Sequence, residues 1–363
     1  MKIGIDISQI IYSTGVSTYT LNLVNKLLEI DHDNEYILFG GSLRNYPKLF
    51  KMAGKLIHGR LNSRFNGFLF PPFLADIVWN KLHTLNIEHF TGNLDVFHSS
   101  DWAQPPSNAF NITTIHDLVP IMYPKISDPR IVAVHKRRLE RVKKDCQLLI
   151  VPTNTIMKDM EKLGFDIKKV KCIPEACDAE FVKSDPRRVK QVQIKYHIRG
   201  SYLMVMGTDP RKNISRILAA YMKIKTKIDL KLVVVGAYER VKDETRGVIY
   251  TGKISKKDVI ALYSGAELLL YPSLYEGFGL PILEAFTIGT PVITSNLGSM
   301  KEVAGKGAYL VDPYNVDKIS KAIEDVLKDR KKYIGLGSEE VKKFSWEKTA
   351  YETLRLYKSF KVK

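Results

Sequence analysis

The sequence predicts an α/β protein of two domains, each with a mostly parallel sheet that carries helices on both faces. Three observations lead to this prediction. The chain has 363 residues, more than one ordinary hydrophobic core accommodates. Its first half alternates short apolar segments with longer segments of helical period, which is the pattern of parallel strands joined by crossover helices. Its second half repeats this alternation.

Apolar segments of strand length, bounded by polar or turn residues, define the strands of the first half. We expect these strands at residues 2–8, 35–39, 94–98, 112–115 and 148–152. A helix is expected at residues 16–28, between the first two strands. Such a crossover brings consecutive strands into parallel alignment.

Four further apolar segments form the strands of the second half. We expect them at residues 202–206, 231–235, 267–270 and 291–294. Residues 174–188 are polar and charged and are predicted to link the halves. We therefore place the first domain at residues 1–178 and the second at residues 179–345. An amphipathic helix is predicted over residues 346–363, and its apolar face is formed by Trp346, Ala350, Leu354, Tyr357 and Phe360.

The composition is that of a soluble globular protein, with 45% hydrophobic and 26% charged residues. Asp6 interrupts the apolar run that a secretory leader needs, and no segment approaches the about 18 apolar residues of a membrane span. The chain has three cysteines, an odd and sparse set that indicates a reducing compartment. Cys172 and Cys177 lack a second ligand pair for zinc. We expect a cytoplasmic protein.

The charge is strongly basic, since 56 Lys and Arg against 39 Asp and Glu give +17. Such an excess favours anionic partners. The densest basic cluster is residues 136–144, on a predicted helix whose buried stripe is His135, Leu139, Val142 and Cys146. A solvated surface explains the cluster without a partner, and contact with an acidic membrane is the functional alternative that we favour. Nucleic acid is not expected, because no aromatic residues are interleaved and no nucleic-acid-binding motif is present.

Residues 274–284, Leu-Tyr-Glu-Gly-Phe-Gly-Leu-Pro-Ile-Leu-Glu, separate Glu276 from Glu284 by seven residues around a glycine-containing turn. A buried strand precedes this turn and a helix follows it, with Pro281 and Glu284 expected in the first helical turn. An open helix N-terminus after a strand is an anion site, and phosphate is its usual ligand. Two carboxylates beside a phosphate site favour a ligand that also offers hydroxyl groups, as a nucleotide-sugar does.

A structural alternative is that Gly277 and Gly279 serve only the turn and that Glu284 only complements the helix dipole, an effect of a few tenths of a kcal/mol. The whole segment, however, resembles the Glu-to-Glu signature of the retaining glycosyltransferases of family 4 (group 1), which have the GT-B fold. The resemblance continues at residues 289–293, Gly-Thr-Pro-Val-Ile, and at residues 310–313, Leu-Val-Asp-Pro. It implies two Rossmann-like domains that face each other across a cleft, with the final helix packed back on the first domain. It also implies that the first domain, residues 1–178, binds the acceptor and that the second, residues 179–345, binds the nucleotide-sugar.

Arg211 and Lys212 follow the first strand of the second domain and precede Asn213. Ligands of open α/β folds bind at this carboxyl end of a strand. A solvated helix start is the alternative, but basic residues oppose the dipole there, so a bound anion would explain them. The pair also matches the diphosphate-binding pair of the family.

In the first domain, Gly15 lies between a strand and a helix, where backbone can approach a phosphate or a sugar. Many relatives have two adjacent glycines here, whereas this chain has Thr14 before Gly15. His116 follows another predicted strand, and the resemblance places it near the donor sugar. Asp117 either orients the His116 ring or caps the next segment. We expect His98 to be structural rather than part of the acceptor site.

The resemblance also implies roles for the remaining site residues. His116 and Glu276 are the expected catalytic residues, with Glu276 beside the donor hexose. Glu284 is expected to accept hydrogen bonds from the ribose diol. The backbone of Gly277, Phe278, Gly279 and Leu280 is expected to contact sugar and phosphate. Retention in this family is usually ascribed to a front-face mechanism, in which the departing phosphate takes the proton of the acceptor.

No metal and no cofactor are expected beside the nucleotide diphosphate-sugar. The one Asp-x-Asp string, Asp31-His32-Asp33, lies in a predicted turn, where Asp is an ordinary residue. Fixed cations and dipoles can instead neutralise the leaving diphosphate.

The expected activity is transfer of a hexose from a nucleotide diphosphate-sugar to a hydroxyl of a glycan or a lipid-linked glycan, in cell-surface polysaccharide biosynthesis. Mannose from a guanine nucleotide is our guess for the donor. The enzyme is expected in the cytoplasm, or peripherally on the cytoplasmic face of the membrane. The alternatives are a nucleotide-sugar-binding GT-B protein without activity, a GT-B phosphorylase and a basic nucleic-acid-binding protein.

Overall fold

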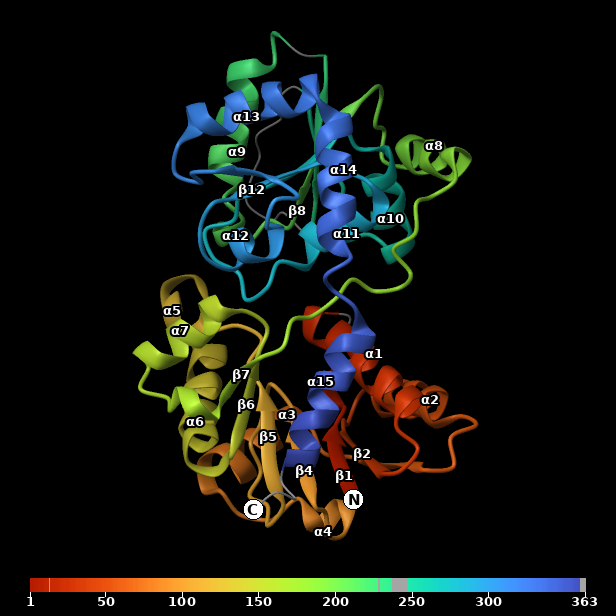
Figure 1. Cartoon of the computed structure of the whole chain (residues 1–363), viewed down its shortest axis with the longest axis vertical. Coiled ribbons are helices and arrows are strands. Elements are labelled where there is room, and N and C mark those ends of the chain that lie inside the picture. Colours follow the sequence, from red (N-terminus) through yellow and green to blue (C-terminus); the bar gives the residue numbers. More distant parts are fainter. Residues whose placement is uncertain (13, 228, 237–246, 360–363) are drawn as a thin grey trace. The chain divides into compact units, whose positions relative to one another are not determined.

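A computed structural model describes residues 1–12, 14–227, 229–236 and 247–359 (Figure 1). The chain divides into two compact units. Unit 1 comprises residues 1–175 together with the segment from Ser345 onwards, and unit 2 comprises Ala176–Phe344. Phe360 and the rest of residues 360–363, predicted to end the final helix, lie outside the described residues.

Unit 1 contains a seven-stranded parallel sheet of order β3-β2-β1-β4-β5-β6-β7. Its strands are β1 (Lys2–Asp6), β2 (Glu35–Gly41), β3 (Ser63–Phe68), β4 (Val96–Ser99), β5 (Phe110–Thr114), β6 (Leu148–Val151) and β7 (Val170–Cys172). The chain builds the sheet outwards in one direction from β1 and then in the other from β4. The carboxyl ends of β1 and β4 are therefore a topological switch point, where open α/β sheets bind their ligands.

The helices of unit 1 begin at residues suited to cap them. Thr14 caps α1 by accepting from the Ser17 amide at 3.3 Å, and Asp128 caps α6 by accepting from the Arg130 amide at 2.8 Å. The α-helices are α1 (Gly15–Ile30), α2 (Tyr46–Ile57), α3 (Pro72–Ala75), α4 (Glu88–Thr91), α5 (Val119–Met122), α6 (Pro129–Asp145), α7 (Asn154–Lys162) and α15 (Trp346–Lys358). The 3-10 helices are η1 (Ser8–Ile11), η3 (Pro124–Ile126) and η4 (Ile167–Lys169), and η2 (Asp76–Leu82) is a π-helix.

Helix α15 packs on α1 within unit 1. The rings of Trp346 and Tyr19 meet edge to face, with centroids 5.8 Å apart. Tyr357 of α15 hydrogen-bonds Nδ1 of His98 on β4 at 2.7 Å, although 259 residues separate them. Burial of the apolar face of α15 stabilises this position, by about 25 cal/mol for each Å² removed from water.

Unit 2 contains a six-stranded parallel sheet of order β10-β9-β8-β11-β12-β13. Its strands are β8 (Tyr202–Met206), β9 (Lys231–Val235), β10 (Val248–Tyr250), β11 (Leu268–Tyr271), β12 (Val292–Ser295) and β13 (Tyr309–Val311). Its helices are α8 (Pro186–Lys195), α9 (Ile214–Ile224), α10 (Lys256–Gly265), α11 (Leu280–Ile288), α12 (Gly298–Ala304), α13 (Val316–Lys328) and α14 (Arg330–Val341), with the turn η5 (Pro210–Lys212) before α9. The switch point of this sheet lies between β8 and β11.

The central strand β8 explains why both faces of this sheet are covered. Tyr202 and Met204 pack into a core with residues of α10 and α11, whereas Leu203 and Val205 pack into a second core with residues of α9 and α13. Successive side chains of a strand point to opposite faces, so a continuous apolar segment is buried on both sides.

The predicted α/β class with two parallel sheets is confirmed, and the structure corrects several details. The strands that the sequence analysis did not predict, β3, β7, β10 and β13, are the four sheet edges. Ser8 belongs to η1 rather than to the first strand. The predicted linker at residues 174–188 is wrong at its end, because α8 already begins at Pro186, after the cap residue Asp185.

Helix α6 corrects the prediction for the basic cluster at residues 136–144. Arg138 is only 1% exposed, and Arg137 pairs with Asp76 at 2.5 Å. Arg141 donates to the carbonyls of Asn80 and Lys81. The three arginines therefore pair within unit 1, whereas Lys136, Lys143 and Lys144 are exposed, and contact with an acidic membrane stays a prediction. No helix within the described part of the chain is both long and apolar enough to cross a membrane.

Candidate functional site

Arg211, Lys212 and Glu276 form an ion-pair cluster at the switch point of the unit 2 sheet. The two cations lie in η5, directly after β8, and Glu276 lies in the loop after β11, which pairs with β8. Lys212 Nζ lies 2.6 Å from Glu276 Oε1, and Arg211 Nη1 donates to Glu276 Oε2. Lys212 Nζ also lies 2.6 Å from the Tyr271 hydroxyl. One carboxylate thus orients two cations, so these three groups are formally positive, and the exposed carboxylate of Asp209 lies 3.5 Å from Arg211 Nε.

Asn213 holds the loops that carry this cluster. Its backbone is left-handed, with φ of 66°, a conformation that Asn tolerates better than most residues. Its side-chain amide donates to the carbonyls of Pro272 at 3.1 Å and Pro313 at 2.7 Å. The Leu274 amide also donates to the Arg211 carbonyl at 2.8 Å. The loops after β8, β11 and β13 are therefore fixed relative to one another.

Burial and charge act against each other in this cluster. Burial raises the pKa of Glu276, but Lys212 and Arg211 outweigh that effect and hold the pKa below its usual value. Burial lowers the pKa of Lys212, and the negative charge of Glu276 opposes this shift. Glu276 is consequently ionised and held beside two cations, which suits a group that must tolerate an anionic ligand nearby.

The loop after Glu276 leads into the N-terminus of α11. Gly279 precedes the helix with φ of 104°, a backbone conformation that other residues rarely adopt. Pro281 lies in the first turn, as predicted. Phe278 is 5% exposed, and its ring packs edge to face on Phe344. Its side chain therefore belongs to the core, and only its backbone is suited to contact a ligand. Leu280 is partly exposed at the first helical position.

Glu284 does not lie in the first turn of α11, which corrects the sequence-based expectation. The helix begins at Leu280, so Glu284 is its fifth residue and lies beyond the unpaired amides of the N-terminus. Glu284 Oε2 instead accepts from the Tyr263 hydroxyl at 2.9 Å. Burial raises the pKa of Glu284 to about 7, against the lowering effects of Tyr263, Lys256 and Lys212. A carboxylate with such a pKa is only partly ionised at neutral pH, and hydrogen bonds from the hydroxyl groups of a ligand would stabilise its ionised form.

In unit 1, His116 follows β5 and is held by a residue that the sequence analysis did not single out. Its Nδ1 lies 2.9 Å from Glu175 Oε1, and the Tyr19 ring meets the imidazole edge to face at 4.5 Å. Burial lowers the pKa of His116, but Glu175, Asp101 and Asp117 outweigh it and the net shift is upwards.

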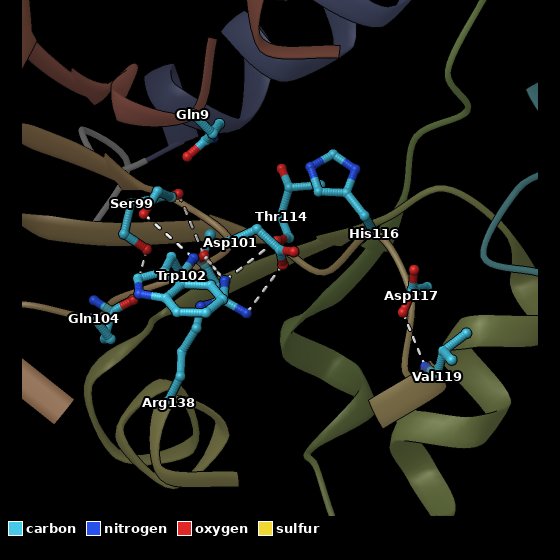
Figure 2. Close-up of polar contacts among 12 residues, drawn as sticks. Gln9, Ser99, Asp101, Trp102, Gln104, Thr114, His116, Asp117, Val119 and Arg138 are labelled. Atoms are coloured by element: carbon cyan, nitrogen blue, oxygen red, sulfur yellow. Dashed lines mark hydrogen bonds and ion pairs between the residues drawn. The ribbon is translucent and has the colours of Figure 1, made fainter. Parts of the chain in front are cut away.

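The remaining residues of unit 1 are placed as follows. Asp117 accepts from the Val119 amide at 2.9 Å, at the start of α5 (Figure 2). Glu175 contacts the His116 ring. His98 is buried, and its Nε2 contacts Thr114 Oγ1 at 2.9 Å. Burial lowers the pKa of His98 to about 3, which suits a structural residue. Gly15 is exposed at the first position of α1, directly after the capping residue Thr14.

The structure thus brings Arg211, Lys212 and Glu276 into direct contact and gives Glu284 a separate partner. Tyr271, Tyr263 and Glu175 were missed. Tyr271 ends the strand before the signature segment, so its position was a usable signal. Glu175 is 59 residues from His116 and has no local signal. Among the described residues, no group of three or more His, Cys, Asp or Glu is arranged to hold a metal ion.

Two family models match the chain. The model described as glycosyl transferases group 1 matches residues 189–341, and the model described as glycosyltransferase family 4 matches residues 13–181. The first match includes Arg211, Lys212, Glu276 and Glu284, and the second includes His116.

Two curated proteins align with this chain over nearly the whole length of both sequences. An uncharacterized glycosyltransferase of Methanocaldococcus jannaschii is 30% identical over 377 residues, covering 95% of this chain and 94% of the relative. O-antigen chain mannosyltransferase B of Escherichia coli is 28% identical over 369 residues, covering 95% and 96%. Among solved structures, Anabaena HepE in complex with UDP and glucose has a TM-score of 0.70 at 13% identity, covering 99% of this chain and 100% of HepE.

Proposed function

The chain belongs to the group 1 glycosyltransferases of GT-B fold, and we propose that it transfers mannose from a nucleotide diphosphate-sugar to a hydroxyl of a glycan or lipid-linked glycan. The mannosyltransferase names among its relatives support the choice of sugar and a role in cell-surface polysaccharide biosynthesis. The observation that carries the proposal is the Arg211–Lys212–Glu276 cluster beside the loop into α11.

In this proposal, the cluster binds the donor diphosphate and stabilises its departure. Negative charge grows on the leaving phosphate, so the ammonium of Lys212 and the guanidinium of Arg211 stabilise the transition state more than the ground state. Glu276 holds both cations in place and lies at the donor hexose. The backbone of Gly277–Leu280 supplies amides at a helix N-terminus, which favour an anion. These groups require no metal ion.

Glu284 and His116 complete the proposed assignment. Glu284 accepts hydrogen bonds from the ribose diol, and the nearby Tyr263 hydroxyl orients its carboxylate. His116, oriented by Glu175, hydrogen-bonds a hydroxyl of the donor sugar. We propose retention of the anomeric configuration by front-face attack, in which the departing phosphate takes the proton of the acceptor hydroxyl.

The donor assignment is tested by a thermal-shift panel of nucleotide diphosphate-sugars, nucleoside diphosphates, inorganic phosphate and a DNA duplex, each with and without EDTA. We expect a guanine nucleotide-mannose to give a large shift that EDTA does not change. A ligand at a hundred times its Kd stabilises the native state by about 2.7 kcal/mol. A shift that EDTA abolishes and magnesium restores would contradict metal independence. A shift with inorganic phosphate instead of a nucleotide would favour a phosphorylase.

Donor affinity should rise with pH and level off above about 7, because the ionised form of Glu284 accepts from the ribose hydroxyls better than the neutral form. Calorimetric titration with the nucleotide-sugar between pH 5 and 8.5 measures this. The affinity should change by no more than about tenfold per pH unit, because donor binding releases at most one proton from Glu284. Glu284→Gln should flatten the profile, and an unchanged profile would remove Glu284 from the site.

The same shift has a consequence for stability. The pKa of Glu284 in the folded protein, about 7, lies above its ordinary value of 4.5. The folded state therefore binds this proton more tightly than the unfolded state, and the contribution of Glu284 to stability falls as pH rises from about 4.5 to about 7. Bound donor should offset this loss, because it favours the ionised carboxylate.

A further inference from the structure

A cavity of about 500 Å³ lies at the switch point of the unit 1 sheet. Asp6 ends β1 and Ser100 directly follows β4, and both residues line the cavity. Five aromatic side chains form much of its wall, namely Tyr12, Phe39, Phe70, Trp79 and Trp102. The cavity thus combines the usual ligand position of an open α/β sheet with an aromatic lining.

Trp102 is an aromatic residue of this wall that can meet a ligand in a fixed orientation. It is partly exposed, whereas Trp79 is 1% exposed. Its indole Nε1 donates to the Pro72 carbonyl at 3.2 Å, and its ring meets the His135 ring edge to face, with centroids 6.0 Å apart. The indole is therefore held in one orientation at the cavity wall. A fixed aromatic ring offers a flat apolar surface at little cost in conformational entropy.

Asp101 provides an oriented carboxylate next to Trp102. Its Oδ1 accepts from Arg138 Nη1 at 3.3 Å (Figure 2). Its side chain is 19% exposed. Arg138 is itself anchored, because Nη2 donates to Thr113 Oγ1 at 2.8 Å and to the Thr114 carbonyl at 3.3 Å. Arg138 therefore acts as a positioning residue behind the cavity and keeps the Asp101 carboxylate at its wall.

The charge of the wall restricts the ligand. Asp6 and Asp101 are both acidic, and the described lining residues include no lysine or arginine. His135 also lines the cavity, and burial lowers its pKa, so it adds little positive charge at neutral pH. Burial raises the pKa of Asp6, and Arg138 pairs with Asp101 from behind the wall, so the net negative charge here is small. A phosphate or pyrophosphate group would nevertheless meet no cation among the described lining residues and is disfavoured. A neutral ligand with hydroxyl groups can instead donate to the two carboxyl groups.

We propose that this cavity binds a neutral sugar residue of the acceptor, with an apolar sugar face on Trp102 and a hydroxyl donating to Asp101. The inference rests on the proposed transferase function and adds the chemical class that the acceptor site recognises. It places the neutral glycan part of the acceptor in unit 1, rather than an isoprenoid chain or its phosphate.

The first test is acrylamide quenching of intrinsic fluorescence in the unaltered protein. The chain has three tryptophans, and Trp79 and Trp346 are 1% and 8% exposed, so quenching reports mainly on Trp102. Methyl α-mannoside and a mannotriose should protect against quenching in a saturable manner, with the trisaccharide effective at lower concentration. Farnesyl phosphate and inorganic phosphate should not protect. Protection by farnesyl phosphate alone, or by neither sugar, would overturn the proposal.

The second test separates the acceptor site from the donor site. Asp101→Asn and Trp102→Ala should raise the KM for the mannotriose acceptor at least tenfold, whereas the calorimetric Kd of the nucleotide-sugar donor should change much less. Trp102→Tyr should retain most of the affinity, because it keeps an aromatic ring. Exposed residues of the same unit, Asp33→Asn and Phe50→Ala, are matched controls.

Three outcomes of this test have different meanings. An unchanged acceptor KM in both variants would refute the cavity assignment and leave the transferase function intact. Weakened donor binding together with loss of transfer in both variants would show that the cavity residues serve the donor or the fold, which also contradicts the assignment. Failure of the unaltered protein to bind or hydrolyse any donor would instead refute the proposed function itself.

Discussion

Replacing Lys212 with alanine should slow hexose transfer by about 100- to 1,000-fold, the usual cost of removing one group that stabilises developing negative charge. The ammonium of Lys212 lies 2.6 Å from Glu276, and its side chain is 13% exposed, so solvent screens it little. Without Lys212, the buried Glu276 keeps Arg211 as its cation, and we expect the pKa of Glu276 to rise because one lowering charge is lost.

The measurement compares kcat with the Kd of the nucleoside diphosphate and of the nucleoside alone. We expect Lys212→Ala to weaken the diphosphate compound strongly and the nucleoside little, because only the former carries the charge that Lys212 meets. Lys223→Ala is the matched control, since Lys223 is half-exposed in a surface pair with Asp317. Equal losses for both ligands would mean that Lys212 supports the fold rather than the diphosphate.

Replacing His116 with alanine should reduce the transfer rate by about 100-fold or more and weaken donor binding much less. The imidazole is buried, and its Nδ1 faces Glu175 Oε1 at 2.9 Å. A residue fixed in this way can stabilise a transition state without reorganising. Single-turnover rates and calorimetric Kd values separate the two effects. Full activity of the variant would show that His116 serves only to pack against Tyr19.

Glu175→Gln should act through His116 and shift its titration. The negative charge of Glu175 raises the pKa of His116, so the neutral amide should move the limb of the pH–rate profile that His116 controls to lower pH. Glutamine can still accept a hydrogen bond from the ring, so the loss of rate should be smaller than for His116→Ala. His32→Ala, at an exposed loop position, is the control. A profile that does not move would exclude this positioning role for Glu175.

Strands in the middle of each sheet could be predicted from the sequence, and strands at the edges could not. The prediction for β8, residues 202–206, agrees with the structure at both ends, because a central parallel strand is buried on both faces and therefore continuously apolar. In contrast, β3 is Ser-Arg-Phe-Asn-Gly-Phe, and β7 and β10 have three residues each. Edge strands have one neighbour and more solvent, so their sequences carry a weaker pattern.

The candidate site likewise has features that could be predicted from the sequence and features that could not. The positions of Arg211, Lys212 and Glu276 at strand ends were predictable, because a parallel sheet brings the carboxyl ends of its strands to one edge. Their mutual ion pairs were not predictable, since 64 residues separate Lys212 from Glu276 and the pairing depends on side-chain direction. The place of Glu284 in α11 was also missed, because helix starts shift by one or two residues with the local cap.

The amino-acid sequence was enough to predict the alternation of strands and helices, the family, and the short segments in which the site residues lie. These properties follow from local periodicity, turn residues and motif spacing. The tertiary structure alone decided that Arg138 is buried behind Asp101, that Glu175 holds His116, and that five aromatic side chains meet in one cavity. Such contacts join residues far apart in the chain, and their formation depends on how the elements pack, which no local pattern encodes.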